Sequence, residues 1–318
     1  MSFQYRIFFL IMMGAECLNA AIAIAQPAKL PVKVHSPGRS ILSLPFQIAE
    51  DQEFYKDEGI NVEFLVMPTG AGVQALIAGD VDASQILGLT LRAAINRGAP
   101  LKIAMVFNDR PTYSLMSRKD ITNPEDLKGK IIASSSPGAS SDVLLQRWLT
   151  QKKLAPRKDL TIVYIGATAI TYQALARGSV AAAVLVPPFD ARSKTEGFYE
   201  LSNFGKEDLG PFLGGGVSVS DKFLHERPDA MTRFLRGTWK ALRLLKTNRK
   251  VSLGIMEKSL NLTPEIAGLV YDSTIGSFTD YGFNSEDWQI KLLEHEVGRG
   301  DRSLVRKTFD FSVVKGFR

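Results

Sequence analysis

Short runs of β-branched and apolar residues alternate with helix-like segments from Pro31 onward, and this alternation constrains the fold more than any other feature of the sequence. The apolar spacing of residues 44–59 indicates a helix that Gly59 closes, and residues 71–80 have a similar pattern. Such alternation is typical of parallel sheets with helices on both faces. The runs that we interpret as strands are 31–36, 61–67, 101–108, 130–134, 160–166 and 181–186.

An internal repeat indicates that the chain contains two similar α/β units. At an offset of 99 residues, the segment 69–83 aligns with 168–182, and both contain the pattern QAL-x-x-G-x-V-x-A. Each copy follows a strand and precedes another run of small residues. Chance similarity between two units rich in Ala, Gly and Val is the alternative. The number of identities in one register favours two related lobes.

Composition excludes several classes of protein. The 318 residues are 45% hydrophobic and 23% charged, which is typical of globular proteins and not of disordered, collagenous or coiled-coil chains. One Cys and three His leave little for a metal site, so we expect no metal and no cofactor. No G-x-S-x-G, H-E-x-x-H or S-x-x-K motif is present, and no catalytic residue is predicted.

The first 25 residues have the order of a secretory signal peptide: an early Arg, an apolar run at 7–15, and small residues suited to cleavage after Ala25. A membrane anchor is the alternative, but Glu16 interrupts the apolar stretch before it reaches the ~20 residues that span a bilayer. We therefore expect a mature protein outside the cytoplasm. Cleavage would also remove Cys17, so no disulfide is expected.

Two α/β lobes in one chain create a crevice, and parallel α/β sheets bind ligands beyond the carboxyl ends of their strands. Helix N-termini offer unpaired N–H groups and a positive dipole there, which favour anionic or strongly polar ligand groups. Three loops follow a strand and open a helix with Ser, Thr or Gly, at 68–72, 134–142 and 166–171. Ordinary N-capping is the alternative for any one loop. Three such loops at one edge favour a binding cleft.

Two further segments have plainer interpretations. Basic residues recur at three- and four-residue steps over 233–246, with apolar residues between them. This indicates an amphipathic helix with a solvated basic face, rather than a patch for nucleic acid or lipid. The triple glycine at 214–216 lacks the flanking strand and helix of a phosphate-binding loop, so we interpret it as a flexible crossing between lobes.

Several segments together resemble the periplasmic solute-binding proteins of ATP-driven importers, in the group that includes nitrate-, sulfonate- and taurine-binding proteins and the fungal thiamine-pyrimidine synthases. The segments that carry the resemblance are 44–65, 75–84, 121–142, 174–188 and 308–314. The resemblance implies an α/β, type II periplasmic-binding-protein fold, in which two crossover segments join two lobes around a central cleft. We place the crossings near Ser117 and Gly214. The implied organisation is signal peptide 1–25, lobe 1 at 26–117, lobe 2 at 118–213, and a return to lobe 1 with C-terminal helices at 214–318.

The resemblance also implies a binding site by position. Arg39 and Arg110 are candidates for a cationic contact, because a guanidinium matches an oxyanion with two N–H groups; surface exposure is the alternative for each. A wall formed by Phe189, with Phe107 or Tyr113, would instead favour a planar organic ligand. The predicted ligand-binding residues are Ser36, Gly38, Arg39, Thr69, Gly70, Leu87, Gly88, Arg110, Ser135, Gly138, Ser140, Thr168, Pro187 and Phe189.

The implied function is capture of a small polar or anionic ligand by a monomer that closes on it and docks on permease subunits, in the periplasm of a Gram-negative bacterium and without a nucleic-acid partner. Two alternatives stay open. One is an exported enzyme related to the thiamine-pyrimidine synthases, with His35 as its acid/base, although those synthases use a cysteine-rich segment that this chain lacks. A packed or capping role is the plainer reading of His35. The other is an extracytoplasmic sensor. The ligand itself, whether sulfonate, nitrate or aromatic, is left open by the sequence.

Overall fold

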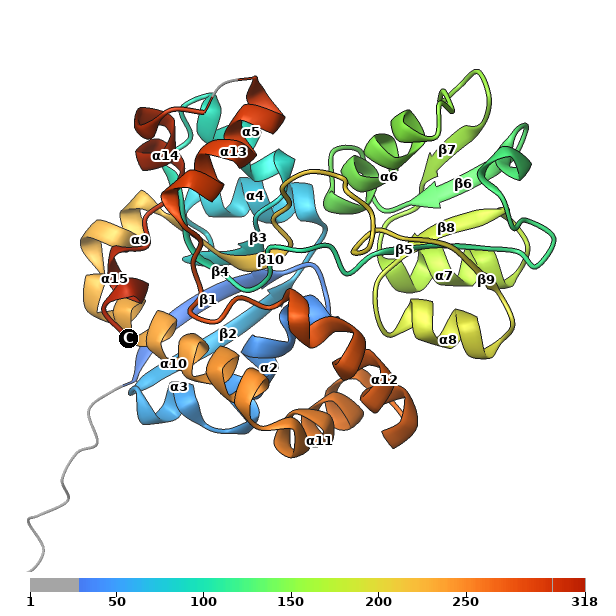
Figure 1. The fold of residues 1–318 in the computed structure, drawn as a ribbon. Helices are drawn as coiled ribbons and strands as arrows, with labels where there is room; N and C mark the ends of the chain where they lie inside the picture. The colour runs from blue at the N-terminus through green and yellow to red at the C-terminus, as the bar shows by residue number, and fades with distance from the viewer. Residues whose placement is uncertain (1–28, 299, 318) are drawn as a thin grey trace, which may run out of the picture.

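The computed structural model describes residues 29–298 and 300–317, so the predicted signal peptide at 1–25 lies outside the described residues. Two lobes lie side by side, and each is built on a five-stranded sheet covered by helices (Figure 1). The strand orders are β2-β1-β3-β10-β4 in lobe 1 and β7-β6-β8-β5-β9 in lobe 2. The predicted two-lobed α/β architecture is confirmed.

Each sheet contains four parallel strands and one antiparallel strand, where the sequence predicted parallel sheets. The antiparallel strands are β10 in lobe 1 and β5 in lobe 2, and each is the first strand after a crossover between the lobes. Lobe 1 contains β1 (Leu30–Ser36), β2 (Ile60–Val66), β3 (Ala83–Ile86), β4 (Leu101–Val106) and β10 (Gly215–Ser220). Lobe 2 contains β5 (Ser114–Ser117), β6 (Ile131–Ser134), β7 (Thr161–Tyr164), β8 (Ala182–Leu185) and β9 (Tyr199–Asn203).

Helices follow most strands, and a helical segment completes lobe 1. The predicted helix at 44–59 is divided in two, because Glu53 adopts the left-handed conformation with φ 54°. The helices before β10 are η1 (Ile41–Ser43), α2 (Leu44–Asp51), α3 (Phe54–Asp57), α4 (Thr69–Ala78), α5 (Leu89–Asn96), η2 (Pro124–Leu127), α6 (Ser140–Gln151), α7 (Thr168–Ala176) and α8 (Phe189–Thr195). Those after it are α9 (Asp221–Glu226), α10 (Pro228–Thr247), α11 (Arg249–Leu260), α12 (Pro264–Thr274), η3 (Ile275–Ser277), α13 (Glu286–Val297), α14 (Arg302–Thr308) and α15 (Ser312–Lys315).

The sequence repeat corresponds to the same structural unit in both lobes. Its first copy forms α4 between β2 and β3, and its second forms α7 between β7 and β8. The repeated glycines, Gly79 and Gly178, follow their helices with φ of 81° and 72°, a conformation that favours glycine. The repeated leucines, Leu76 and Leu175, are buried beneath their helices. The repeat therefore marks equivalent strand–helix–strand units.

The chain crosses between the lobes twice, at 107–113 and 204–214. The first crossover ends before the predicted position near Ser117, because residues 114–117 already pair as β5 within the lobe 2 sheet. The triple glycine ends the second crossover and is closely packed rather than flexible. A Cβ at Gly214 would lie 2.6 Å from the Asn108 amide, and one at Gly216 would overlap the carbonyl of Met105. Glycine here allows the two crossover backbones to approach each other.

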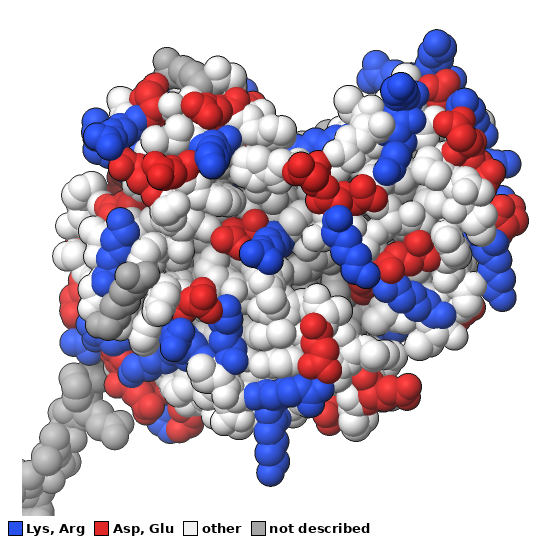
Figure 2. Space-filling view, viewed as in Figure 1, with Lys and Arg blue, Asp and Glu red and all other residues white. Residues whose placement is uncertain are grey.

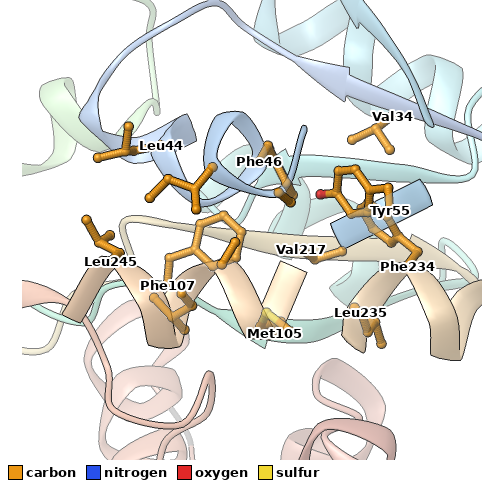
Figure 3. Close-up of a cluster of buried hydrophobic side chains, with 14 of the residues drawn as sticks. Val34, Leu44, Phe46, Tyr55, Met105, Phe107, Val217, Phe234, Leu235 and Leu245 are labelled. Atoms are coloured by element: carbon orange, nitrogen blue, oxygen red, sulfur yellow. The ribbon is translucent and has the colours of Figure 1, made fainter. Parts of the chain in front are cut away.

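The core of lobe 1 lies between its sheet and the long helix α10 (Figure 3). Phe46 packs against Phe107 and Phe234, with ring centroids 5.2 and 6.1 Å apart. As predicted, the opposite face of α10 is basic, and there Arg236 and Lys240 both pair with Glu58. Basic and acidic side chains are interspersed on the visible surface (Figure 2). Within the described ranges, no helix is both long and apolar enough to cross a bilayer.

Candidate ligand-binding site between the lobes

Two of the predicted ligand loops, one from each lobe, face each other. Gly88 is the N-cap of α5 in lobe 1, and a Cβ placed on it would lie 3.6 Å from the hydroxyl oxygen of Ser140, the first residue of α6 in lobe 2. A Cβ on Gly138 would likewise lie 3.9 Å from the hydroxyl oxygen of Thr90. The surface is hollowed between the two lobes (Figure 2). The starts of α5 and α6 are thus the structural centre of the candidate site.

The hydroxyls predicted at these helix starts do not cap their own helices. Thr69, Ser140 and Thr168 each occupy the first helical position, and the N-caps before them are Pro68, Ala139 and Ala167. None of these three helices has a side-chain cap, and neither has α5. The alternative that these Ser and Thr residues are ordinary caps is therefore wrong. Helix dipoles and N–H groups at this edge favour a polar or anionic ligand.

The loop before α6 contains a compact set of hydroxyls. Ser141 Oγ lies 2.6 Å from Ser135 Oγ and accepts a hydrogen bond from Ser134 at 3.0 Å. Ser140, next to them, lies near the hydroxyl of Tyr113: burial raises the pKa of Tyr113, and Ser140 partly offsets this. Ser135 is thereby held by its own loop, whereas Ser140 faces lobe 1.

A buried carboxylate also belongs to this loop. Asp142 accepts hydrogen bonds from the backbone N–H of Gly138 at 2.8 Å and from the hydroxyl of Tyr164 at 2.9 Å. Gly138 adopts φ 71°, which turns its N–H toward this carboxylate. The N–H of Gly138 is therefore already used within the protein.

The lobe 1 loop after β1 is held by a side chain from β3. Ser36 donates to Gln85 Oε1 at 2.7 Å and accepts from the backbone N–H of Gly38 at 3.3 Å. The side chain of Leu87 is completely buried in the lobe 1 core, so it can present only backbone to a ligand. Leu87 stays a predicted ligand-binding residue through its backbone alone.

The two predicted cations lie outside the facing loops, Arg39 after β1 and Arg110 on the first crossover. Arg39 is exposed. Burial raises the pKa of Glu50, and the positive charge of Arg39 offsets only part of this rise. Arg110 is exposed on the first crossover beside Asp109, whose carboxylate accepts from Asn284 at 2.7 Å. Both arginines therefore correspond to the surface alternative.

The start of α8 forms another part of the lobe 2 edge. Pro187 is buried, and Phe189 packs against Tyr172 with ring centroids 5.5 Å apart. Asp190 is buried, and burial raises its pKa to about 6. Its Oδ1 accepts from the backbone N–H of Ala191 at 2.7 Å, while Ser114 lies 3.5 Å from Oδ2. This edge thus carries an acid that can be neutral in mildly acidic solution.

The aromatic wall predicted from the sequence is reduced to Phe189. Phe107 is completely buried in the lobe 1 core. Tyr113 packs edge-on against Phe212, and burial raises its pKa to about 12. Phe107 fails as a wall residue because it lies at the end of β4, where its ring turns inward onto Phe46.

His35 is part of the lobe 1 core and has no free ring nitrogen. Its Nε2 lies 3.0 Å from the carbonyl of Met67, so this nitrogen carries the proton, and its Nδ1 then accepts from Ser84 at 2.9 Å. Burial lowers its pKa, which keeps the ring neutral. These contacts fit a structural histidine and do not fit an acid/base.

Several residues of this region were not predicted as site residues. Thr90 faces Gly138 across the lobes, and Asp142 and Gln85 hold the loops of lobe 2 and lobe 1. Asp142 is four residues after Gly138 in the predicted serine loop, so its local acceptor role had a sequence signal. Thr90 and Gln85 had none, because only tertiary packing sets their orientation.

A comparison with known protein families shows which family this chain belongs to. The NMT1/THI5-like family matches residues 42–249, which is more than half of the sequence. The chain belongs to the NMT1/THI5-like family. Its similarity to YtlA of Bacillus subtilis (strain 168), named as a candidate binding protein, is 24% identity over 219 residues. That match covers 66% of this chain and 64% of YtlA, just under two thirds of the relative.

Two solved structures illustrate the fold of this NMT1/THI5-like chain. The alkanesulfonate-binding protein SsuA from Xanthomonas axonopodis pv. citri, solved bound to MOPS, has a TM-score of 0.69 and 21% identity, with 90% of this chain and 99% of SsuA covered. The desulfurization enzyme DSZB has a TM-score of 0.64 and 13% identity, with 91% and 99% covered. The same fold therefore occurs in a binding protein and in an enzyme.

Proposed function

We propose that this protein is the extracytoplasmic solute-binding component of an ATP-driven importer, and that it captures a small polar or anionic organic molecule between its lobes without transforming it. The observation that carries the proposal is the opposition of Gly88 and Ser140, from different lobes, at the starts of two helices without side-chain caps. Such helix starts supply N–H donors from both sides of one space.

The donors at this edge favour an oxyanion such as a sulfonate. Ser140, Thr168 and Thr69 supply hydroxyls at first helical positions. A Cβ on Gly70 would meet nothing within 4 Å, so Gly70 leaves room for a ligand against the backbone. Charge recognition would come from N–H groups and helix dipoles, because Arg39 and Arg110 are exposed. SsuA, which is similar in fold, is an alkanesulfonate-binding protein, and this likeness supports the same ligand class.

The environment of His35 argues for binding without catalysis. A general acid or base must reach its substrate, and His35 is completely buried with both nitrogens bonded to protein groups. Among the described residues, no group of three or more His, Cys, Asp and Glu is arranged to hold a metal ion. DSZB has the same fold and is an enzyme, so the two functions must be separated by experiment. Under the proposal, the bound ligand is recovered chemically unchanged.

Capture would follow the population-shift scheme of two-lobed receptors. A ligand that contacts both lobes binds the closed form more tightly than the open form, and so increases the closed population. The closed monomer would then dock on membrane-embedded permease subunits in the periplasm, where the predicted signal peptide would deliver it.

A thermal-shift panel tests the proposal. The purified protein is screened with sulfonates including taurine and MOPS, nitrate, carboxylates, aromatic acids and pyrimidines. A ligand at ~100 times its Kd stabilises the protein by about 2.7 kcal/mol, which raises Tm by several degrees. The strongest compound should also reduce the radius of gyration in solution scattering. A stabilising compound that leaves the radius unchanged, or that the protein converts to a product, contradicts the proposal.

A further inference from the structure

Glu296, in the last turn of α13, lies between two arginines from different lobes. Arg92 of α5 donates to both carboxylate oxygens, from Nε at 2.6 Å and from Nη2 at 2.5 Å. Arg147 of α6, in lobe 2, places its Nη2 3.7 Å from Glu296 Oε1. The side chains of Glu296, Arg92 and Arg147 are 3%, 5% and 16% exposed. Water and salt therefore screen these charges much less than they screen a surface ion pair.

This cluster, Arg92–Glu296–Arg147, joins the two loops of the candidate site. Arg92 also donates to the carbonyl of Leu87, the residue before Gly88. Arg147 follows Ser140 on the same helix by seven positions, about two turns. A displacement of α6 relative to lobe 1 therefore changes the separation of Arg147 and Glu296 together with that of Ser140 and Gly88.

Arg147 also anchors the second crossover. Its Nη1 donates to the carbonyls of Leu209 and Pro211, each at 3.0 Å. The same guanidinium thus contacts the crossover and the carboxylate of lobe 1. These contacts place the cluster where the relative orientation of the lobes is set.

The cluster holds two positive charges and one negative charge. Burial lowers the pKa of Arg147, the negative charge of Glu296 raises it, and the positive charge of Arg92 lowers it. Removing the negative charge would leave two guanidinium groups near each other across the interface with no anion between them. Neutralising Glu296 should therefore separate the lobes more than removing Arg147 does.

We infer that Glu296 is a positioning residue: it fixes the Gly88 loop through Arg92 and stabilises the approach of the two lobes through Arg147. The inference rests on the proposed closure of two lobes and is independent of which ligand is bound. Because the cluster already holds the two lobes near each other in the ligand-free protein, ligand contacts must supply less free energy to close the lobes.

Distance measurements between the lobes of the ligand-free full-length protein test this inference. Spin labels are attached to Ser303→Cys on α14 and Thr150→Cys on α6, both exposed positions, in a Cys17→Ser background. Glu296→Gln and Arg147→Met should both lengthen the mean distance, with the larger shift for Glu296→Gln. Lys56→Met removes an exposed ion pair with Glu53 at α3 of lobe 1 and should leave the distance unchanged.

The double variant separates electrostatic coupling from loss of packing. Removing Arg147 from the Glu296→Gln protein also removes the repulsion, so the double variant should be less open than Glu296→Gln alone. Equal distances in wild type and both single variants, whatever their Tm values, would overturn the inference, as would additive shifts in the double variant. If Glu296→Gln does not fold, Arg147→Met decides alone, because it leaves the Arg92 contacts of Glu296 in place. Failure of the ligand panel would not alter these distances.

Discussion

The helices at the interlobe edge and those in the C-terminal part of the chain begin differently. The starts of α4, α5, α6 and α7 have no side-chain cap, and their N-caps are Pro68, Gly88, Ala139 and Ala167. In contrast, five of the seven described α-helices after β10 have side-chain caps, namely α9, α11, α12, α13 and α14, which are capped by Ser220, Asn248, Thr263, Ser285 and Asp301. The exceptions are α10 and α15. A side-chain cap stabilises a helix by about 1 kcal/mol. The edge helices lack this stabilisation, although in α4, α6 and α7 a hydroxyl stands one residue after the N-cap.

This difference indicates that the edge keeps its N–H groups for a ligand. A cap occupies the donors that an anion would use, so stability and binding compete at the same atoms. Proteins commonly have locally suboptimal features at sites of function. The comparison therefore predicts that substitutions at the two kinds of helix start separate into effects on affinity and effects on stability.

The largest expected effect is a steric block at the edge. Gly88→Leu should weaken binding of the strongest panel compound by at least about 100-fold, or 2.7 kcal/mol, because a side chain there meets Ser140 and prevents the lobes from approaching. Gly254→Leu is the matched control, since a Cβ on this helical glycine meets nothing within 4 Å. Isothermal titration calorimetry compares the two. Equal affinities would show that the ligand binds elsewhere.

The start of α8 gives a pH-dependent prediction. Burial raises the pKa of Asp190 to about 6, so the folded state favours the protonated acid, and its contribution to stability is lost as pH rises from about 4 through 6. Asp190→Asn should therefore stabilise the protein by roughly 3 kcal/mol at pH 7.5 and by about 1 kcal/mol at pH 4.5, which lies near the lower end of this range. Urea unfolding at both pH values measures this. A gain of the same size at both would contradict the assignment, and Glu226→Gln, an exposed site, is the control.

Alanine substitutions at the two kinds of helix start should give opposite results. Ser285→Ala removes a side-chain cap and should lower the free energy of unfolding by about 1 kcal/mol without changing affinity. Ser140→Ala removes a hydroxyl at the edge that caps nothing, and should reduce affinity by roughly fivefold, or about 1 kcal/mol, with a smaller change in stability. Urea unfolding and calorimetry are measured on both variants. The comparison fails if both variants lose only stability.

The smallest effect comes from adding a cap where the edge has none. Ala167 is the exposed N-cap of α7, with extended φ and ψ that suit a capping serine. Ala167→Ser should raise stability by about 0.5–1 kcal/mol and weaken ligand binding by a few-fold, because the new hydroxyl occupies an N–H group. A variant that gains stability with unchanged affinity would show that α7 takes no part in binding.

Much of the fold could be predicted from local patterns, because strand–helix alternation and the repeat at 69–83 and 168–182 are properties of short segments. The antiparallel direction of strands β5 and β10 could not be predicted from local patterns. The partners of β5, which are β8 and β9, lie far along the chain, so the direction in which β5 pairs has no local signal. The predicted crossing near Ser117 was late, because nothing local distinguishes a short strand from a linker.

The site could be predicted by loop but not by side chain. The loops carrying Gly88 and Ser140 do face each other, yet Arg39 and Arg110 are exposed, because local sequence does not set the direction of a long side chain on a loop. Whether a hydroxyl is the N-cap or the first helical residue depends on a one-residue shift that helix patterns do not resolve. The pairing of Arg92 with Glu296 joins residues 204 positions apart and has no local signal.

Hydrogen–deuterium exchange with the strongest panel compound tests most directly whether uncapped helix starts hold the ligand. The account predicts slower exchange on binding at the first amides of α5 and α6, around 89–91 and 140–142, with little change at the capped starts of α12 and α13. Protection confined to the capped helices, or absent from both α5 and α6, would contradict it.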